Sequence, residues 1–108
     1  MIAQIAPAEL AAWLADAARP APLVVDVREP WEVERCAIDG AQAIPLRELP
    51  GRLAELPPER EIVLVCHHGG RSQHAAMWLA GNGYHRLFNL RGGVDAWATD
   101  VDPAMPRY

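Results

Sequence analysis

Seven consecutive residues, 66–72, carry the side chains best suited to chemistry. They read Cys-His-His-Gly-Gly-Arg-Ser. Four residues separate Cys66 from Arg71, few enough for the loop to curl back around the sulfur. Gly69 and Gly70 permit backbone angles that other residues resist, so successive N–H groups can converge on one point. The spacing predicts an anion cradle with a sulfur atom at its centre.

The surroundings of Cys66 predict a reactive thiolate. A helix starting after the loop adds the partial positive charge of its N-terminus, and Arg71 adds a full charge. Both favour the ionised sulfur, which is the nucleophilic form, and both attract an anionic substrate. The plainer interpretation is a small buried hydrophobe at a strand end. We prefer the reactive interpretation because glycines, an arginine and a helix start coincide at this cysteine.

Short elements of alternating type must position this loop. Apolar spacing predicts helices after Pro7 and over about 46–56, 71–80 and 93–99, with a helical turn at 30–35. Apolar runs predict strands at 23–25 and 62–65, and shorter ones at 43–44 and 87–89. The alternation implies an α/β fold, a central parallel β-sheet with helices on both faces. Ligands collect at the carboxyl ends of such strands, where Cys66 lies.

Composition predicts one ordinary globular domain and excludes several functions. The 108 residues are 51% hydrophobic, so we expect a single domain over 1–108, with a core of about 5–99 and an extended tail at 100–108. All ten positive residues are arginine, so no mechanism that needs an enzyme lysine applies. The net charge of -4 argues against nucleic acid and anionic membranes as partners.

The cysteine count and the N-terminal residues favour a cytoplasmic location. Cys36 and Cys66 are too few for the disulfide framework of a small secreted protein. Residues 1–6 carry no positive charge, and no apolar run approaches the length of a membrane span. We therefore expect neither a signal peptide nor a membrane anchor. Cys36 has no cradle around it and is expected to be an inert thiol.

On these motifs the sequence resembles the rhodanese family of sulfurtransferases. The loop matches the family's Cys-x-x-Gly-x-Arg-Ser/Thr pattern through Cys66, Gly69, Arg71 and Ser72. Similar segments elsewhere are the Asp-x-Arg stretch within 25–29, Ile-Asp-Gly-Ala at 38–41 with Ile-Pro at 44–45, and Leu-Arg-Gly-Gly at 90–93 with Trp97. The order and spacing of these segments carry the resemblance. One departure is Cys-Ala at 36–37, where the family often has Gly-His.

The resemblance implies a single rhodanese-like domain that moves sulfur in two steps. Cys66 would attack the outer sulfur of a small anionic donor, thiosulfate or a similar sulfane compound. A second nucleophile would then take the sulfur: cyanide, glutathione or a protein thiol, on a thioredoxin-like or sulfur-carrier protein. Catalysis would rest on Cys66 and Arg71. The loop residues that would bind the donor are His67, His68, Gly69, Gly70 and Ser72. No metal and no organic cofactor is implied.

Two other functions stay open beside sulfur transfer. Related cell-cycle phosphatases and arsenate reductases have one residue more in this loop, so the six residues from Cys66 to Arg71 favour sulfur chemistry. The other alternative is a non-catalytic interaction module. Modules of that kind in the family commonly lack the cysteine, so the intact loop argues against it.

The histidines near Cys66 also suggest a metal site. Cys66, His67, His68 and His74 invite it, but neighbouring residues in a tight loop point in different directions, and no Cys-x-x-Cys pair is present. We therefore expect no metal. His67 and His68 are expected to line the pocket mouth or to lie in solvent, and His74 to lie on a helix surface.

Asp26 and Arg28 follow a buried strand and reach the same sheet edge as Cys66. They would support the site by shaping the pocket or bracing Arg71. The alternative, which we prefer, is a salt bridge or hydrogen bond that holds the loop after the strand. Trp13, Trp78 and Trp97 are expected to be core or partly buried anchors. Nothing in the tail at 100–108 suggests chemistry.

Overall fold

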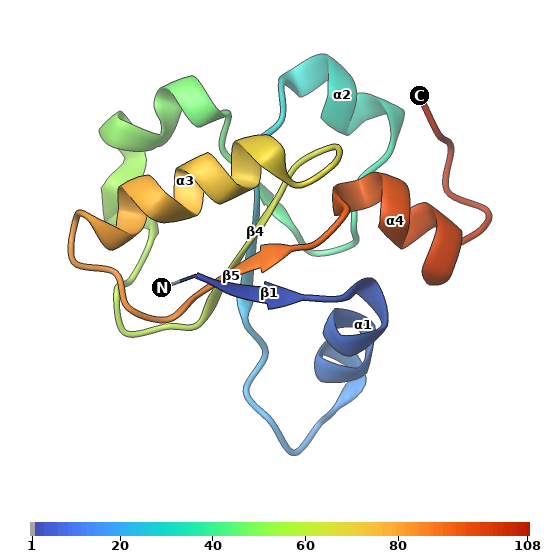
Figure 1. Ribbon diagram of the computed structural model, residues 1–108, viewed down its shortest axis with the longest axis horizontal. Coiled ribbons are helices and arrows are strands. Elements are labelled where there is room, and N and C mark those ends of the chain that lie inside the picture. Colours follow the sequence, from blue (N-terminus) through green and yellow to red (C-terminus); the bar gives the residue numbers. More distant parts are fainter. Residues whose placement is uncertain (1) are drawn as a thin grey trace.

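A five-stranded, wholly parallel β-sheet runs through the middle of the molecule (Figure 1). A computed structural model describes residues 2–108, so Met1 lies outside the described residues. The strands lie in the order β1-β5-β4-β2-β3. Their bounds are β1 (Ala3–Ile5), β2 (Leu23–Asp26), β3 (Gln42–Ala43), β4 (Ile62–Val65) and β5 (Leu87–Leu90). The predicted parallel sheet is confirmed, and β4, which precedes Cys66, is its central strand.

Helices cover both faces of the sheet, as predicted. They are α1 (Pro7–Ala15), α2 (Pro30–Arg35), the 3-10 helix η1 (Leu46–Glu55), α3 (Gly70–Ala80) and α4 (Gly93–Asp100). On one face α1 packs beside α4, and on the other α3 packs beside η1 (Figure 1). The remaining helix, α2, begins just beyond the carboxyl end of β2. It therefore lies at the edge of the sheet where Cys66 is found.

Alternation along β4 divides the core into two layers. Val63 and Val65 face the cluster under α1 and α4, which includes Leu10, Trp13 and Trp97. Ile62 and Leu64 face the opposite cluster, built on α3 and η1. Successive residues of a strand point to opposite faces of the sheet, and helices cover both faces, so all four β4 side chains are fully buried. This explains why the strand reads as one continuous apolar run.

The sequence patterns did not predict the first strand, β1. It has three residues, of which only Ile5 is buried, and alanine and glutamine have little preference for strands. The strand exists because it pairs with β5, with Gln4 opposite Asn89 and Ile5 opposite Leu90. A pairing partner 85 positions along the chain leaves no local pattern to detect.

The beginning of α4 packs directly on the end of β4. Val94 donates its backbone N–H to the carbonyl of Cys66 at 2.9 Å, and Asp95 donates to that of His67 at 3.1 Å. A Cβ on Gly93 would lie 2.3 Å from the Cys66 carbonyl oxygen, and the φ of Gly93 is +61°. Only glycine allows this approach, so the second glycine of the Gly-Gly pair positions the cysteine loop.

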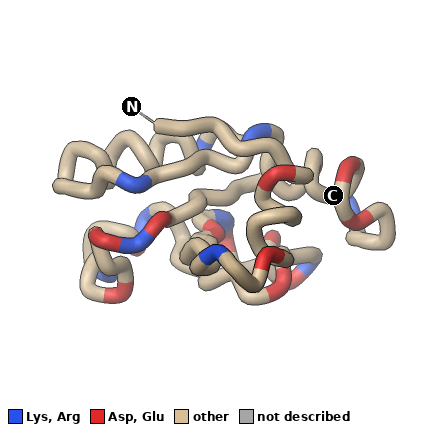
Figure 2. Tube along the Cα trace, turned by 90° about the horizontal axis from the view of Figure 1, so that it is seen from below, with Lys and Arg blue, Asp and Glu red and all other residues tan. Residues whose placement is uncertain are grey.

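Charged residues of both signs are interspersed along the chain. Figure 2 shows acidic and basic positions close to one another rather than gathered on faces of one sign. On η1, for example, Arg52 pairs with Glu48 and Glu55. Within residues 2–108, no helix has the length and apolar character needed to cross a membrane.

Replacing Gly93 by alanine tests the close packing of α4 on the cysteine loop. Gly93→Ala should destabilise the protein by ~2 kcal/mol or more, because it adds both backbone strain and a backbone clash. The melting temperature should fall by roughly 10 °C in a thermal unfolding scan. Gly51→Ala is the matched control, since Gly51 has ordinary backbone angles and open space around it. Equal melting temperatures for the two variants would contradict this account.

Candidate functional site

The sulfur of Cys66 lies buried at the end of β4, inside a ring of hydrogen-bond donors. Cys66 is 1% exposed. The N–H of Gly69 donates to its Sγ at 3.0 Å, and the hydroxyl of Ser72 lies 3.3 Å away. Gly69 precedes α3 with a φ of +105°, a conformation that favours glycine. Gly70 has ordinary helical angles, so the expectation that both glycines supply unusual backbone angles is wrong for Gly70.

These donors lower the pKa of the Cys66 thiol below its ordinary value. Burial by itself raises this pKa, because a thiolate loses its hydration. The hydroxyl of Ser72 and the backbone N–H groups of Ser72, Gly69 and His68 act in the opposite direction and outweigh burial. The expected thiolate therefore depends on hydrogen bonds, and Ser72 is the strongest contributor.

Asn89, on β5, holds this arrangement from the side. Its Oδ1 lies 2.5 Å from the hydroxyl of Ser72, and its Nδ2 donates to the carbonyl of Gly69 at 3.2 Å. Nδ2 also donates to Gln4 of β1 at 2.9 Å. One hydroxyl proton thus serves two acceptors, and an ionised Cys66 is the stronger of them because its hydrogen bond is charge-assisted. Sequence patterns gave no sign of Asn89, a polar residue in a buried strand.

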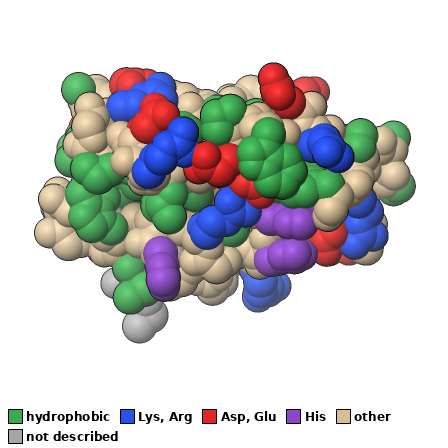
Figure 3. Space-filling model, turned by 90° about the horizontal axis from the view of Figure 1, so that it is seen from above, with side chains coloured by type: hydrophobic (Ala, Val, Ile, Leu, Met, Phe, Trp, Pro, Cys, Tyr) green, Lys and Arg blue, Asp and Glu red, His purple; other side chains and the backbone are tan. Residues whose placement is uncertain are grey.

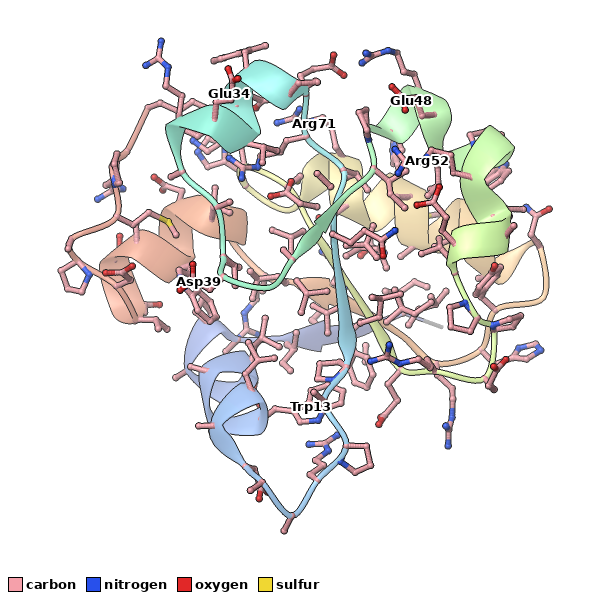
Figure 4. All side chains as sticks on the ribbon, turned by 180° about the vertical axis from the view of Figure 1, so that it is seen from behind. Trp13, Glu34, Asp39, Glu48, Arg52 and Arg71 are labelled. Carbon is pink, nitrogen blue, oxygen red and sulfur yellow. The ribbon has the colours of Figure 1, made fainter. Side chains whose placement is uncertain are left out.

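Arg71 is held in an ion pair with Glu32 of α2. Its two terminal nitrogens donate to the two carboxylate oxygens of Glu32, each at 2.8 Å. Figure 4 labels Arg71 where the start of α3 approaches α2. Glu32 is 4% exposed, whereas the Arg71 side chain is 39% exposed. The sequence predicted a free positive charge beside the sulfur, but this charge is offset by a buried carboxylate that sequence reasoning missed. A carboxylate on the short helix after the Asp-x-Arg stretch was the available signal.

Asp26 and Arg28 form a fully buried ion pair beside the loop. The closest approach is 2.6 Å, and both side chains are about 1% exposed or less. Arg28 also donates to the carbonyls of Cys36 at 2.7 Å and Glu32 at 3.3 Å. The pair therefore ties β2 to the ends of α2, as the preferred salt-bridge interpretation predicts. The alternative that this pair directly braces Arg71 is wrong, because Glu32 does so.

The rings of His67 and His68 stack on each other, and a tail residue joins them. Their rings stack with centroids 4.0 Å apart, and the ring of Tyr108 stacks on the other side of His67 at 4.0 Å. Figure 3 shows two histidine side chains against each other on this face of the molecule. Burial lowers the pKa of His67, and the neighbouring His68 lowers it further, so the His67 ring is neutral at pH 7.

Tyr108 connects the tail to the paired charges. Its hydroxyl donates to Glu32 at 3.0 Å and accepts from Arg28 at 2.9 Å. The tail is also held by buried Met105 and by Arg107, which pairs with Asp95 at 2.8 Å. The sequence offers no sign of this contact, because the segment has no periodicity and reaches the site only through folding.

The residues of the metal hypothesis do not converge. His74 lines a hollow between α3 and η1 with Trp78, apart from the other members of the set. A different group, His67, His68 and Asp95, brings its ligand atoms within 4.8 Å of one another. The rings of the two histidines are stacked on each other, and Asp95 is paired with Arg107.

The other singled-out residues pack as anchors or remain at the surface. Trp13 and Trp97 are buried, whereas Trp78 is 38% exposed. Trp31, at the start of α2, is 55% exposed and meets Tyr108 edge to face. Cys36 is buried, with its sulfur 3.9 Å from Arg28.

A buried cysteine at the end of a central parallel strand, in a loop closed by an arginine, is matched by a known protein family. The family model for the Rhodanese-like domain matches residues 6–100. The chain belongs to the rhodanese-like family. A crystal structure of a rhodanese-like domain protein from Staphylococcus aureus has a TM-score of 0.85 and 27% identity, and the match covers 99% of each chain. The fold is therefore the rhodanese-like fold.

Curated relatives support a sulfurtransferase in general. A protein named sulfurtransferase from Allochromatium vinosum is 42% identical over 76 residues, which are 70% of this chain and 71% of the relative. The Rhodanese-like/PpiC domain-containing protein 12 of Arabidopsis thaliana is 37% identical over 89 residues. That match covers 79% of this chain but only 30% of the Arabidopsis protein, so this rhodanese-like domain corresponds to a part of the longer relative.

The role of Ser72 in stabilising the thiolate is open to a direct test. Ser72→Ala should raise the pKa of Cys66, so the midpoint of the pH dependence of iodoacetamide alkylation should move up by about one pH unit. The measurement uses the intact mass of the protein, in a Cys36→Ser background. Thr99→Ala, which removes a hydroxyl from the exposed side of α4, should leave the midpoint unchanged. An unshifted midpoint in Ser72→Ala would exclude Ser72 as the main donor.

The Glu32 ion pair predicts a specific acid sensitivity. Hydrogen bonds from Arg71 lower the pKa of Glu32 to about 2, from an ordinary 4.5. Because the folded pKa is the lower one, this stabilisation is present above pH 4.5 and is lost as the pH falls towards 2. Urea unfolding should show that the wild-type midpoint falls more steeply over this range than that of Glu32→Gln. Parallel curves would show that the pair contributes nothing to stability.

Proposed function

We propose that this rhodanese-like domain is a sulfurtransferase that carries sulfur as a persulfide on Cys66, with thiosulfate or a similar sulfane compound as donor. The observation that carries the proposal is the buried Cys66 sulfur, held by the N–H of Gly69 and the hydroxyl of Ser72 at the end of the central strand. These groups lower the thiol pKa, and a nucleophilic sulfur is what sulfur transfer requires.

In the first step the Cys66 thiolate attacks the outer sulfur of the donor. A new S–S bond forms, the S–S bond of the donor breaks, and the leaving group departs with the electron pair, as sulfite when the donor is thiosulfate. The lowered pKa of the Cys66 thiol favours the ionised sulfur, and an ionised sulfur needs no general base. The N–H groups around Gly69 and the hydroxyl of Ser72 then stabilise the negative charge of the persulfide.

In the second step an acceptor removes the sulfur. A thiolate or cyanide attacks the outer sulfur of the persulfide, and Cys66 leaves as a thiolate, ready for another cycle. The loop N–H groups orient the donor, Arg71 holds the start of α3 against Glu32 of α2, and His67 and His68 line the way by which both molecules enter. Asp26 and Arg28 support the loop from behind through their buried pair.

A protein thiol is a suitable acceptor for this site. The sulfur lies below a rim of aromatic rings, His67 and Tyr108, and Trp31 is exposed beside them. A sulfur-carrier or thioredoxin-like protein can present a cysteine over such a rim. Free Cys36 and Cys66 agree with a reducing compartment, and we place the protein in the cytoplasm on that ground.

The competing functions differ in what they require of Cys66. A phosphatase or arsenate reductase needs room for a tetrahedral oxyanion in the loop, whereas here the loop has six residues and its N–H groups already contact the sulfur. A non-catalytic module needs no reactive cysteine at all. The donors gathered around a buried sulfur favour the catalytic function.

Incubation with thiosulfate should add the mass of one sulfur atom to the protein. The physical reason is the double displacement, which leaves the outer sulfur on Cys66. Intact-mass spectrometry should show the gain in wild type and in Cys36→Ser, and Cys66→Ser should abolish it. Hydrolysis of an aryl phosphate without any mass gain from thiosulfate or other sulfane donors would instead favour the phosphatase alternative.

A further inference from the structure

The positive charge of Arg71, at the cysteine loop, is already paired with the carboxylate of Glu32. Arg71 gives both terminal nitrogens to Glu32, at 2.8 Å each. A carboxylate in bidentate contact cancels most of the field of a guanidinium at the distance of a third group. A donor that reaches Cys66 therefore meets an ion pair and not a free cation.

Glu32 is fixed in this position. Besides the two bonds from Arg71, its carboxylate accepts the N–H of Glu29 at 2.9 Å and the hydroxyl of Tyr108 at 3.0 Å. The residue is 4% exposed. Four hydrogen bonds and burial separate this pair from a mobile surface salt bridge. Glu32 consequently does not swing away to release Arg71 for an incoming anion.

Two further arginines at this end of the molecule are paired as well. Within residues 2–108, Arg28 lies against Asp26 at 2.6 Å, and Arg107 lies against Asp95 at 2.8 Å. His67 is neutral at pH 7 because burial lowers its pKa. The N–H groups of the loop and the start of α3 still attract an anion, but through partial charges.

Charge distinguishes the sulfur donors that such a site accepts. Thiosulfate carries two negative charges, so its reaction with the Cys66 thiolate gathers three at one point. A persulfide R–S–SH is uncharged when protonated and singly charged when ionised. Its reaction, in which the thiolate takes the outer sulfur and R–S⁻ leaves, gathers one or two. With the charge of Arg71 offset by Glu32, the second reaction is favoured electrostatically.

We propose that Glu32 determines donor specificity: by occupying Arg71 it biases the site against dianionic donors and towards sulfane donors of low charge, of the persulfide class. This inference rests on the proposed function of Cys66. Glu32 acts through Arg71 and does not touch the reacting sulfur, so it is a positioning residue.

The test compares two donors that differ by one charge. Methanethiosulfonate has the same transferable sulfur as thiosulfate, with a methyl group in place of one charged oxygen. Rate constants for loading Cys66 are measured by quenched-flow mass spectrometry for both donors, at equal ionic strength. Glu32→Gln keeps the shape of the side chain and frees the charge of Arg71. It should raise the thiosulfate rate constant by about tenfold relative to that of methanethiosulfonate.

Glu34→Gln is the matched control, because Glu34 is an exposed glutamate on the same helix, labelled with Arg71 in Figure 4. It makes the same change in net charge and should leave the ratio of the two rate constants within about twofold of wild type. The double variant Glu32→Gln/Arg71→Gln replaces the ion pair by a neutral pair. It should also keep the wild-type ratio, since the pair contributes little net charge.

Three results would overturn the inference. In the first, Glu32→Gln lowers both rate constants alike, as a purely structural residue would. In the second, the double variant has a much lower ratio of the thiosulfate to the methanethiosulfonate rate constant than wild type. That result would show that Arg71 acts on the donor in the wild-type protein. A protein that is loaded by neither donor would contradict the proposed function itself, and this inference with it. If Glu32→Gln fails to fold, the double variant still decides.

Discussion

Burial of the Cys66 sulfur is the constraint on which the rest of the site depends. A thiolate that leaves water loses its hydration, and only hydrogen bonds or charges in the protein can replace it. Here the replacement is a set of N–H groups and one hydroxyl, gathered by a loop that turns at Gly69. The loop keeps this shape because its neighbours hold its carbonyls: α4 binds those of Cys66 and His67, and Asn89 binds that of Gly69.

The charges near the sulfur are arranged in pairs that stabilise the frame. Asp26 with Arg28, and Glu32 with Arg71, link β2, α2 and α3 across the carboxyl edge of the sheet. A buried charge without a partner would cost several kcal/mol, on the order of 3 or more, so Arg28 is paired with Asp26 and the buried Glu32 with Arg71. Structural pairing and attraction of a substrate thus compete for the same guanidinium. This competition is why the charge of Arg71 alone does not describe the electrostatics of the pocket.

The tail contributes to the site without resembling a functional segment. Tyr108 stacks on His67 and bonds to both Glu32 and Arg28, so one side chain contacts a loop histidine and both ion pairs. A residue of this kind is invisible in a local pattern, since it directly follows the exposed Pro106 and Arg107. Sequence reasoning missed Asn89 and Glu32 for the same reason. The contact of Asn89 with Ser72 spans 17 positions of the chain, and the contact of Glu32 with Arg71 spans 39.

Local sequence determined the alternating elements, the strand that ends at Cys66 and the loop that follows it. Apolar runs, glycines and the spacing from Cys66 to Arg71 act over a few residues, and their physical consequences are readable one element at a time. Tertiary structure decided which partner each charge and each donor found. The strand order places β2 and β5 on either side of β4, so Glu32 reaches Arg71 and Asn89 reaches Ser72. Those contacts arise from packing between distant segments, because hydrogen bonds and ion pairs depend on position in space rather than on position along the chain.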